Sequence, residues 1–164
     1  MADSEQEYVE FLALVGNAIG QWAYIEDKLL DIFIRAIGVS GEKIDRARAA
    51  YHATINFRIK LDMTNAALRT YLDETQAQDW GRIYRRLEKK ARKRALVSHS
   101  HVTRVVEGVD GTSTPKIRPN PTNPTKRQSY FSGAEDIDSK KLIEITKDFV
   151  QMQRDLAAFL KELP

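Results

Sequence analysis

Apolar residues recur at intervals of three and four along the first forty residues of the chain. The positions on this face are Tyr8, Phe11, Leu12, Val15, Ile19, Trp22, Leu29 and Phe33. Such spacing places side chains on one side of an α-helix and is typical of a helix that packs against a core. The pattern therefore predicts one long helix that ends near Gly38 and Ser40.

Two shorter amphipathic helices are expected next. The first covers residues 41 to about 51, and Ser40 is of a residue type that often caps helix N-termini. The second covers about 57 to 72, and its apolar side carries Leu61, Leu68 and Leu72. Short loops between these segments favour antiparallel packing of neighbouring helices.

Two long helices follow, separated by a stretch of a different kind. The helix expected after Thr75 has an apolar stripe formed by Trp80, Ile83, Tyr84, Leu87, Ala91 and Ala95. The last helix, from about Asp138 to Leu160, is expected to bury Leu142, Ile145, Phe149, Met152, Leu156 and Phe159. The near-heptad spacing of this last face suits packing within the bundle or against a second subunit.

The stretch between these helices predicts a strand and an excursion. His101 to Glu107 is rich in Val and Thr, which favours a strand, and residues 108–136 hold four of the five prolines. This excursion is expected to form a loop, or a hairpin that touches a polyanion, and its basic residues are Lys116, Arg118, Lys126 and Arg127. The predicted fold class is all-α. It is an up-and-down bundle of four to five helices, with a short β-hairpin or Pro-rich excursion before the last helix.

Length and composition narrow the class of protein. A chain of 164 residues that is 42% hydrophobic suits a single domain spanning residues 1–164. The absence of cysteine excludes disulfides, thiol nucleophiles and cysteine-ligated zinc. The acidic start and the lack of an apolar run of about 18 residues predict a cytoplasmic protein without a membrane partner.

Positive charge is concentrated in the predicted fourth helix. Residues 82–94 hold eight Lys or Arg and one acid, Glu88, whereas the net charge of the whole chain is only +3. Basic residues outside the apolar stripe are candidates for binding nucleic acid: Arg82, Arg85, Arg86, Lys89, Lys90 and Lys93. A solvated helix face without a ligand is the alternative interpretation.

Two histidines follow this basic segment in the sequence KRALVSHSHV, residues 93–102. Arg94 and His99 are separated by four residues, so their side chains point about 140° apart on an ideal α-helix. The two groups converge if the helix ends near Ser98, if the long arginine side chain reaches across, or if a second copy supplies one of them. Dimerisation would then be part of the mechanism.

The stretch from Arg94 to His99 resembles the R-x4-6-H signature of the HEPN superfamily of small helical-bundle proteins. Further similarity lies in Trp22 four residues before Glu26, in NFRIKLDMTNAAL and in VSHS, and it extends over about residues 15–101 and the closing helix. The resemblance implies a metal-independent endoribonuclease with its site at a homodimer interface. It also implies a bacterial toxin or defence effector with RNA as substrate and an antitoxin as partner.

The resemblance assigns roles to the motif residues and requires no cofactor or metal. A histidine, whose pKa is ordinarily about 6.5, serves as acid or base near neutral pH, so His99 is the candidate for proton transfer. Arg94 would hold the scissile phosphate, and His101 would bind RNA with the basic helix. Ser98 is expected to support this site. A capped helix C-terminus and a two-histidine metal site are the alternative interpretations.

Other arrangements also satisfy the motif. Arg92 with His99, and Arg94 with His101, both fall within the allowed spacing. The residue after the motif arginine is Ala95, where catalytic members typically have a polar residue. This difference favours a non-catalytic RNA- or nucleotide-binding module, and a helical protein–protein adaptor is a third hypothesis.

Glu26 lies in line with Trp22 on the apolar face of the first helix. A buried carboxylate needs a partner that neutralises it. Pairing with Lys60 or Arg58 would make Glu26 structural, whereas pairing with Arg94 would let it orient the site. The structural role is favoured.

Overall fold

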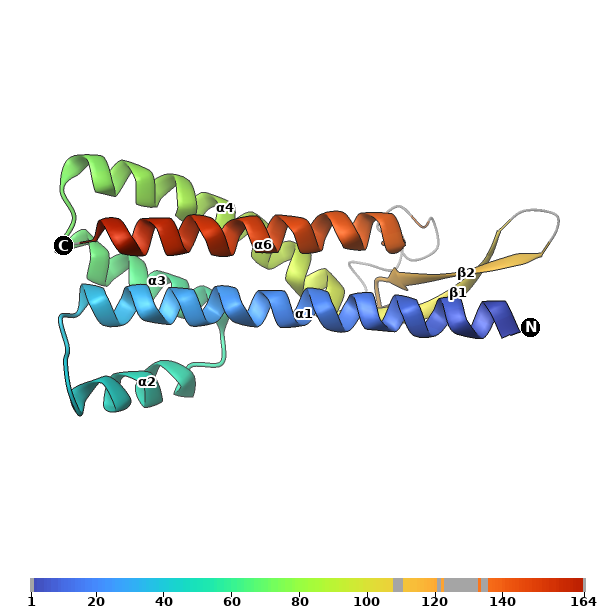
Figure 1. The fold of residues 1–164 in the computed structure, drawn as a ribbon, viewed down its shortest axis with the longest axis horizontal. Helices are drawn as coiled ribbons and strands as arrows, with labels where there is room; N and C mark the ends of the chain where they lie inside the picture. The colour runs from blue at the N-terminus through green and yellow to red at the C-terminus, as the bar shows by residue number, and fades with distance from the viewer. Residues whose placement is uncertain (1, 108–110, 121, 123–132, 134–135, 164) are drawn as a thin grey trace. The chain divides into compact units, whose positions relative to one another are not determined.

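The structure is a computed structural model that describes residues 2–107, 111–120, 122, 133 and 136–163. Five helices and one hairpin occur within these residues: α1 (Ala2–Ala36), α2 (Lys43–Ala53), α3 (Phe57–Arg69), α4 (Glu74–His99), β1 (His101–Glu107), β2 (Thr112–Arg118) and α6 (Ser139–Glu162) (Figure 1). The all-α class and a hairpin before the last helix are confirmed. Residues 123–132, with Lys126 and Arg127, lie outside the described part.

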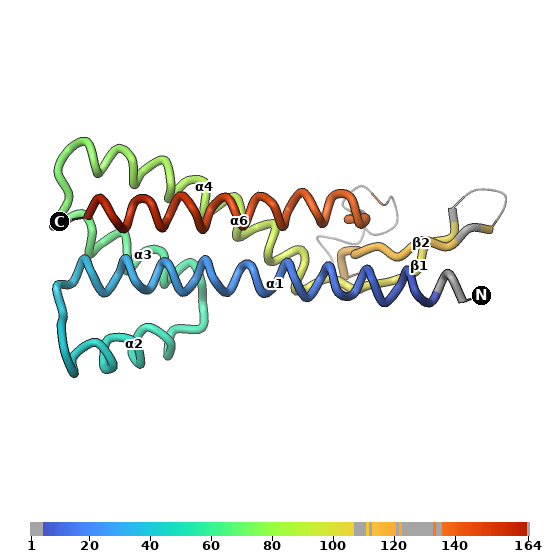
Figure 2. The backbone as a smooth tube through the Cα atoms, viewed as in Figure 1, coloured from blue at the N-terminus to red at the C-terminus, as the bar shows by residue number. Residues whose placement is uncertain are grey.

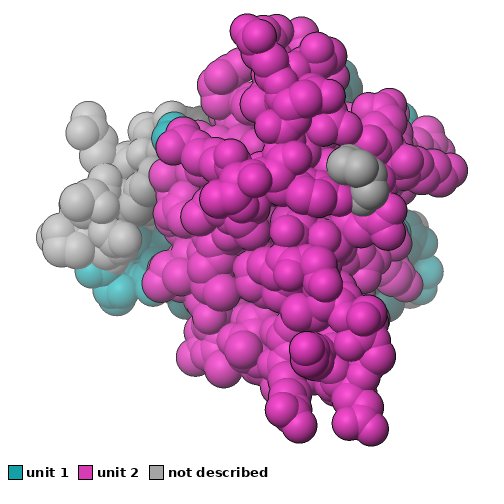
Figure 3. All heavy atoms as spheres, turned by 90° about the vertical axis from the view of Figure 1, so that its left-hand side faces the viewer, with its two compact units in different colours: residues 1–21, 92–148 teal, residues 22–91, 149–164 magenta. Residues whose placement is uncertain are grey.

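The chain divides into two compact units, coloured separately in Figure 3. Unit 1 contains residues 1–21 and 92–148, and unit 2 contains residues 22–91 and 149–164. The single-domain assignment stays a prediction. None of the helices in the described ranges combines the length and the apolar character that a membrane span needs.

The core of unit 2 is built from aromatic and aliphatic side chains of all five helices. The Trp22 ring meets the Phe57 ring edge-on with 4.7 Å between centroids, and it meets Phe149 at 5.2 Å. Such edge-to-face pairs stabilise a core beyond the burial of their area. Trp80 and Phe159 form a second pair at 5.4 Å. The six apolar residues expected on α6 are all buried in the chain itself, which confirms that helix face.

Unit 1 contains the hairpin, which is antiparallel and starts at the residue predicted for the strand. In its register His101 lies opposite Arg118, and Val102 lies opposite Ile117. Buried Ile117 also exchanges backbone hydrogen bonds with Ile137, at 2.9 and 3.0 Å. The hairpin interpretation of the excursion is therefore confirmed for residues 112–118.

Side-chain contacts join the hairpin to the first half of α1, which lies alongside it (Figure 2). Arg104 of β1 donates to Glu5 at 2.7 Å, and its guanidinium lies 4.8 Å from the centre of the Tyr8 ring. On the other strand Arg118 donates to Asp136 at 2.9 Å. The Arg104 contacts therefore hold β1 to α1, and the Arg118 bond holds β2 to the segment before α6.

Three sequence predictions about local structure are corrected by the structure. Helix α2 begins at Lys43, and Ser40 does not cap it, because Gly41 has a φ of +60° and turns the chain before the helix starts. Helix α3 ends at Arg69, three residues before the predicted end. At its start the Asn56 side-chain oxygen accepts a hydrogen bond from the Arg58 amide at 2.8 Å. Ala95 is exposed rather than part of the apolar stripe.

The predicted apolar face of α1 is also wrong in its first half. Leu12 and Ile19 are 42% and 41% exposed, whereas Phe11 and Ala18 are almost completely buried. The buried face of this half is therefore rotated away from the two residues that the sequence pattern placed in the core.

Candidate functional site

The motif residues lie at the C-terminal end of α4, in unit 1. The helix continues through His99, so the ideal rotation applies and the Arg94 and His99 side chains diverge by about 140°. Arg94 is half-buried and His99 is exposed. No hydrogen bond joins them in the described part of the chain. One chain alone therefore does not bring the predicted pair together.

Two buried polar atoms beside the motif lack partners among the described residues. They are Nε of Arg94 and Oγ of Ser98. Residues four apart lie on the same side of a helix, one turn above the other. Buried donors without an acceptor are uncommon in folded proteins, and each one needs an explanation. Each of the two groups could therefore bond an acceptor oxygen that the described residues do not supply.

The alternative motif pairs are placed differently. Arg92 and His99 are both exposed, and seven residues of helix return to nearly the same face, about 10 Å further along the axis. Arg94 and His101 are separated by the end of the helix, since His101 is the first residue of β1 and is exposed. Of the three pairs, only Arg92 with His99 shares a helix face within one chain.

Three of the six predicted RNA-binding cations of α4 already have an acidic neighbour. Arg82 pairs with Asp79, and Lys90 is also engaged. Arg86 lies 2.6 Å from Asp155 in unit 2, and Lys93 lies 3.0 Å from Asp148 in unit 1. Exposed ion pairs such as these reduce the charge that is available to a polyanion, although they add little stability.

Arg85 and Lys89 are different from the rest of the basic face. Both are exposed on unit 2 and lie four residues apart on one side of α4. Neither has a hydrogen-bond or ion-pair partner among the residues that the structure describes. They are the two cations of this helix in unit 2 that remain available to a ligand.

A polar network joins α3 to α4 in unit 2. The Tyr84 hydroxyl donates to Asp62 at 2.6 Å, and Arg58 donates to Asp62 at 3.0 Å and also pairs with Glu88. Partial burial, together with the Asp62 carboxylate, raises the pKa of Tyr84 to about 12. The Tyr84 hydroxyl, followed by Arg58, lowers the pKa of Asp62. This network is structural, and it takes Arg58 away from Glu26.

Glu26 belongs to a buried polar cluster in unit 2. Its Oε1 accepts from Nε1 of Trp22 at 2.8 Å, and its Oε2 accepts from Nζ of Lys60 at 2.9 Å. The Lys60 ammonium also lies 5.5 Å from the centre of the Tyr51 ring, and burial raises the pKa of Tyr51. The expected structural pairing with Lys60 is confirmed.

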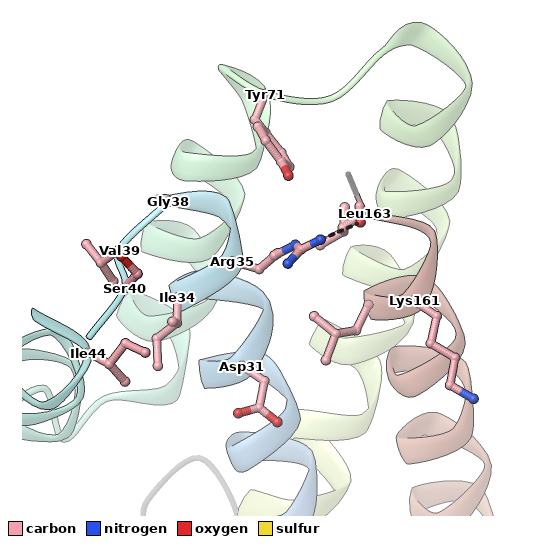
Figure 4. A pocket seen from close by; sticks show the side chains of 11 residues that line it. Asp31, Ile34, Arg35, Gly38, Val39, Ser40, Ile44, Tyr71, Lys161 and Leu163 are labelled. Atoms are coloured by element: carbon pink, nitrogen blue, oxygen red, sulfur yellow. Dashed lines mark hydrogen bonds between the residues drawn. The ribbon is translucent and has the colours of Figure 1, made fainter. Parts of the chain in front are cut away.

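Sequence reasoning missed one cavity in unit 2, which has a volume of about 810 Å³ (Figure 4). It lies where the ends of α1, α3 and α6 meet the start of α2. Its apolar walls include Ile34 and Ile44, and Arg35 donates to the backbone carbonyl of Leu163 at 3.3 Å. No motif marks this cavity, because its walls come from the ends of separate elements. Arg35 serves there as a cap for the last turn of α6.

No family model matches this chain, and no curated protein or solved structure is significantly similar to it. The functional argument therefore depends on the residues of the chain and their geometry. Within the described ranges, no three His, Asp or Glu side chains lie close enough together to hold a metal ion.

Proposed function

We propose that the protein is a metal-independent endoribonuclease that acts as a homodimer. Each site would combine Arg94 of one protomer with the partner's His99. The observation that carries the proposal is the buried Nε of Arg94, which has no partner among the described residues and lies one turn from the similarly placed Oγ of Ser98. Donors left in this state suit a phosphate, which supplies several acceptor oxygens at once.

The chemistry needs one proton acceptor, one proton donor and a stabiliser of negative charge. The ribose 2′-oxygen attacks the adjacent phosphorus as His99 takes the 2′-hydroxyl proton, and the bond from phosphorus to the 5′-oxygen breaks. Water protonates the leaving 5′-oxygen. The products are a 2′,3′-cyclic phosphate and a 5′-hydroxyl. Arg94 cannot lose its proton, so it holds the phosphate and stabilises the extra charge of the transition state.

In this proposal a second copy of the chain supplies the catalytic group that one chain cannot bring to the same phosphate. Arg94 and His99 of one chain face directions about 140° apart, so neither chain alone presents both groups to one phosphate. A two-fold axis that brings two α4 ends together places the exposed His99 of each copy opposite the other copy's Arg94. The site is therefore proposed to be shared in the same way on both sides of the axis.

The proposed biological setting follows from the resemblance to HEPN proteins. In that setting the protein is a toxin or defence effector, RNA in the cytoplasm is its substrate, and an antitoxin protein restrains it. Arg85 and Lys89 supply sequence-independent affinity for the phosphate backbone.

Purified protein is expected to cleave a mixed single-stranded RNA with EDTA present. The fragments should end in a 2′,3′-cyclic phosphate and a 5′-hydroxyl, which mass spectrometry of the products measures. A matched RNA with 2′-deoxyribose at the main cleavage position is expected to resist cleavage there, because it lacks the nucleophile. Intact RNA in both reactions, or equal cleavage of the deoxy-substituted RNA, would refute the mechanism.

A second candidate function is RNA binding without chemistry. The specific observation in its favour is Ala95, which is exposed beside Arg94 and has no group that could contact phosphate or orient an imidazole. In this case Arg85 and Lys89 would carry the interaction, and binding would survive His99→Ala.

Charge reversal at Arg85 is expected to weaken RNA binding more than the same change at Arg82. Arg82 already pairs with Asp79, whereas Arg85 is available. The slope of log Kd against log salt concentration should fall by about one for Arg85→Glu, since one phosphate contact is lost. Titration of labelled RNA at several salt concentrations measures both variants. Equal losses would mean that the intrachain ion pair does not determine which cation meets RNA.

A further inference from the structure

The first half of α1 exposes large apolar side chains along one side. Val9, Leu12 and Ile19 are 53%, 42% and 41% exposed, and all three belong to unit 1. Single exposed apolar residues are normal on a protein surface, whereas a contiguous group of them marks an interaction site. The spacing of these three residues places them within about 80° of one another around the helix.

Small residues lie beside these three on the same side of the helix. This surface, here named the α1 face, consists of Val9, Leu12, Ala13, Gly16, Ile19 and Gly20, all of which are exposed. A side-chain carbon added at Gly16 or at Gly20 would meet nothing within 4 Å. Glycines inside a helix cost stability, so an open groove over two of them needs a reason beyond the fold of the single chain.

Charge is absent from this part of the helix. Between Glu10 and Glu26 the sequence contains no charged residue, although 30% of the whole chain is charged. Glu7 and Glu10 project from α1 at about 100° or more from the centre of the face, whereas Glu5 lies on the same side one turn before Val9 and is paired with Arg104 at 2.7 Å. A partner that brought charges onto this surface would bury them without a counter-charge. The occupant of the α1 face is therefore uncharged where it makes contact.

We infer that the α1 face binds the same face of a second copy of this chain, with the two helices antiparallel and crossing at Gly16. In this arrangement the two-fold axis pairs each position with the one equally far on the other side of Gly16. Leu12 then lies opposite the partner's Gly20, and Ala13 lies opposite the partner's Ile19. Each large side chain meets a small residue, as close packing of two helices requires.

Outside α1 the exposed large apolar residues of the described ranges are Ile37, Ile55, Ile59, Val106 and Ile143, and of these only Ile55 and Ile59 are close in sequence. A contact between unlike surfaces of two copies would need a second surface shaped to fit the first. The α1 face carries both the projecting side chains and the groove that receives them. It is therefore complementary to itself.

The inference deepens the proposed function and rests on it for the purpose of the dimer, because it names a surface through which two copies of the chain would associate. The α1 face and the residues from Arg92 to His99 belong to the same compact unit. The argument from shape and charge does not use RNA cleavage, so the surface and the activity are tested by separate measurements.

Sedimentation equilibrium of the full chain is expected to give a mass twice the 18.7 kDa of one chain. Ile19→Glu should raise the dimer dissociation constant at least tenfold, because it places a charge in the contact. Ile143→Glu is the matched control, since Ile143 is 39% exposed against 41% for Ile19 and lies on α6. The control variant should keep the wild-type dissociation constant.

Gly16→Leu tests the groove without adding charge. The substitution favours the helix, so the fold is retained, but it fills the point where the two helices cross. It should also weaken the dimer at least tenfold. A monomeric wild type, or dimers unaffected by both substitutions, would overturn the inference. A dimer that depends on Ile19 and Gly16 but cleaves no RNA would uphold the surface and refute the ribonuclease.

Discussion

Mixing chains that carry Arg94→Ala with chains that carry His99→Ala is expected to restore RNA cleavage that neither variant has alone. Each substitution by itself should lower the cleavage rate by a factor of about 10² to 10⁴, because it removes one catalytic group from both sites of the dimer. In a mixed dimer, one site loses both groups and the other site keeps both. Random exchange of chains should therefore recover about a quarter of the wild-type rate.

Restoration measures whether the two groups of one site come from different chains. If Arg94 and His99 acted within one chain, every chain in the mixture would be defective and the rate would stay at the level of the single variants. The measurement is the initial rate of RNA cleavage after the two proteins have exchanged subunits. Each variant mixed with itself serves as the control.

The same assay separates the two possible arginines. Arg92 shares a helix face with His99 in one chain, whereas Arg94 does not. If Arg92 is the catalytic arginine, Arg92→Ala will lose cleavage and Arg94→Ala will keep it. If Arg92 and His99 then act within one chain, mixing Arg92→Ala chains with His99→Ala chains will restore no RNA cleavage. The proposed site requires loss with Arg94→Ala and recovery with the mixture.

The sequence predicted the helices well because apolar spacing reports which side of a long helix is buried. All six residues expected on the last helix are buried, and the strand at His101–Glu107 has the predicted bounds. Periodicity failed for the first half of α1, where Leu12 and Ile19 follow the pattern but are exposed. An apolar stripe predicts that something covers it, and it does not distinguish the same chain from a second copy.

The residues of the candidate site stay a prediction, and their geometry depended on where the helix ends. A spacing of four residues identifies Arg94 and His99, yet only the continuation of the helix through His99 shows that one chain keeps them apart. Likewise, the number of Lys and Arg residues in the sequence identified the basic segment but not their partners. The acids that neutralise Arg86 and Lys93 come from α6, some 55 or more residues later, where local sequence gives no signal.

Removal of the Glu26 carboxylate is expected to be the most destabilising polar substitution in unit 2. Lys60 is 9% exposed at its side chain and has Glu26 as its ion-pair partner, at 2.9 Å. Glu26→Ala would leave the ammonium buried without its counter-charge and the Trp22 indole without its acceptor. We expect a loss of about 2–4 kcal/mol in the free energy of unfolding, below the full cost of a completely buried pair because Glu26 is 23% exposed.

Asp31→Ala is the matched control on the same helix. The Lys28–Asp31 pair has a similar separation of 3.1 Å, but its side chains are 40% and 36% exposed. Exposed pairs contribute about 0–1 kcal/mol, so the control should change stability little. Urea unfolding followed by circular dichroism measures both variants. Equal effects of the two substitutions would show that water, rather than Glu26, solvates the Lys60 ammonium.

A double variant separates the cost of an unpaired charge from the worth of the pair. Glu26→Gln combined with Lys60→Met keeps an acceptor for Trp22 and removes both charges, so it should recover most of the stability that Glu26→Ala loses. That outcome would mean that the pair contributes little net stability. The Glu26–Lys60 pair, which lies beside Trp22, Tyr51 and Thr64, would then act on the specificity of packing rather than on stability. Its hydrogen bonds favour one arrangement of α1 against α3, whereas an apolar contact would also tolerate shifted packing. If the double variant stays as unstable as the single one, the pair itself stabilises the fold.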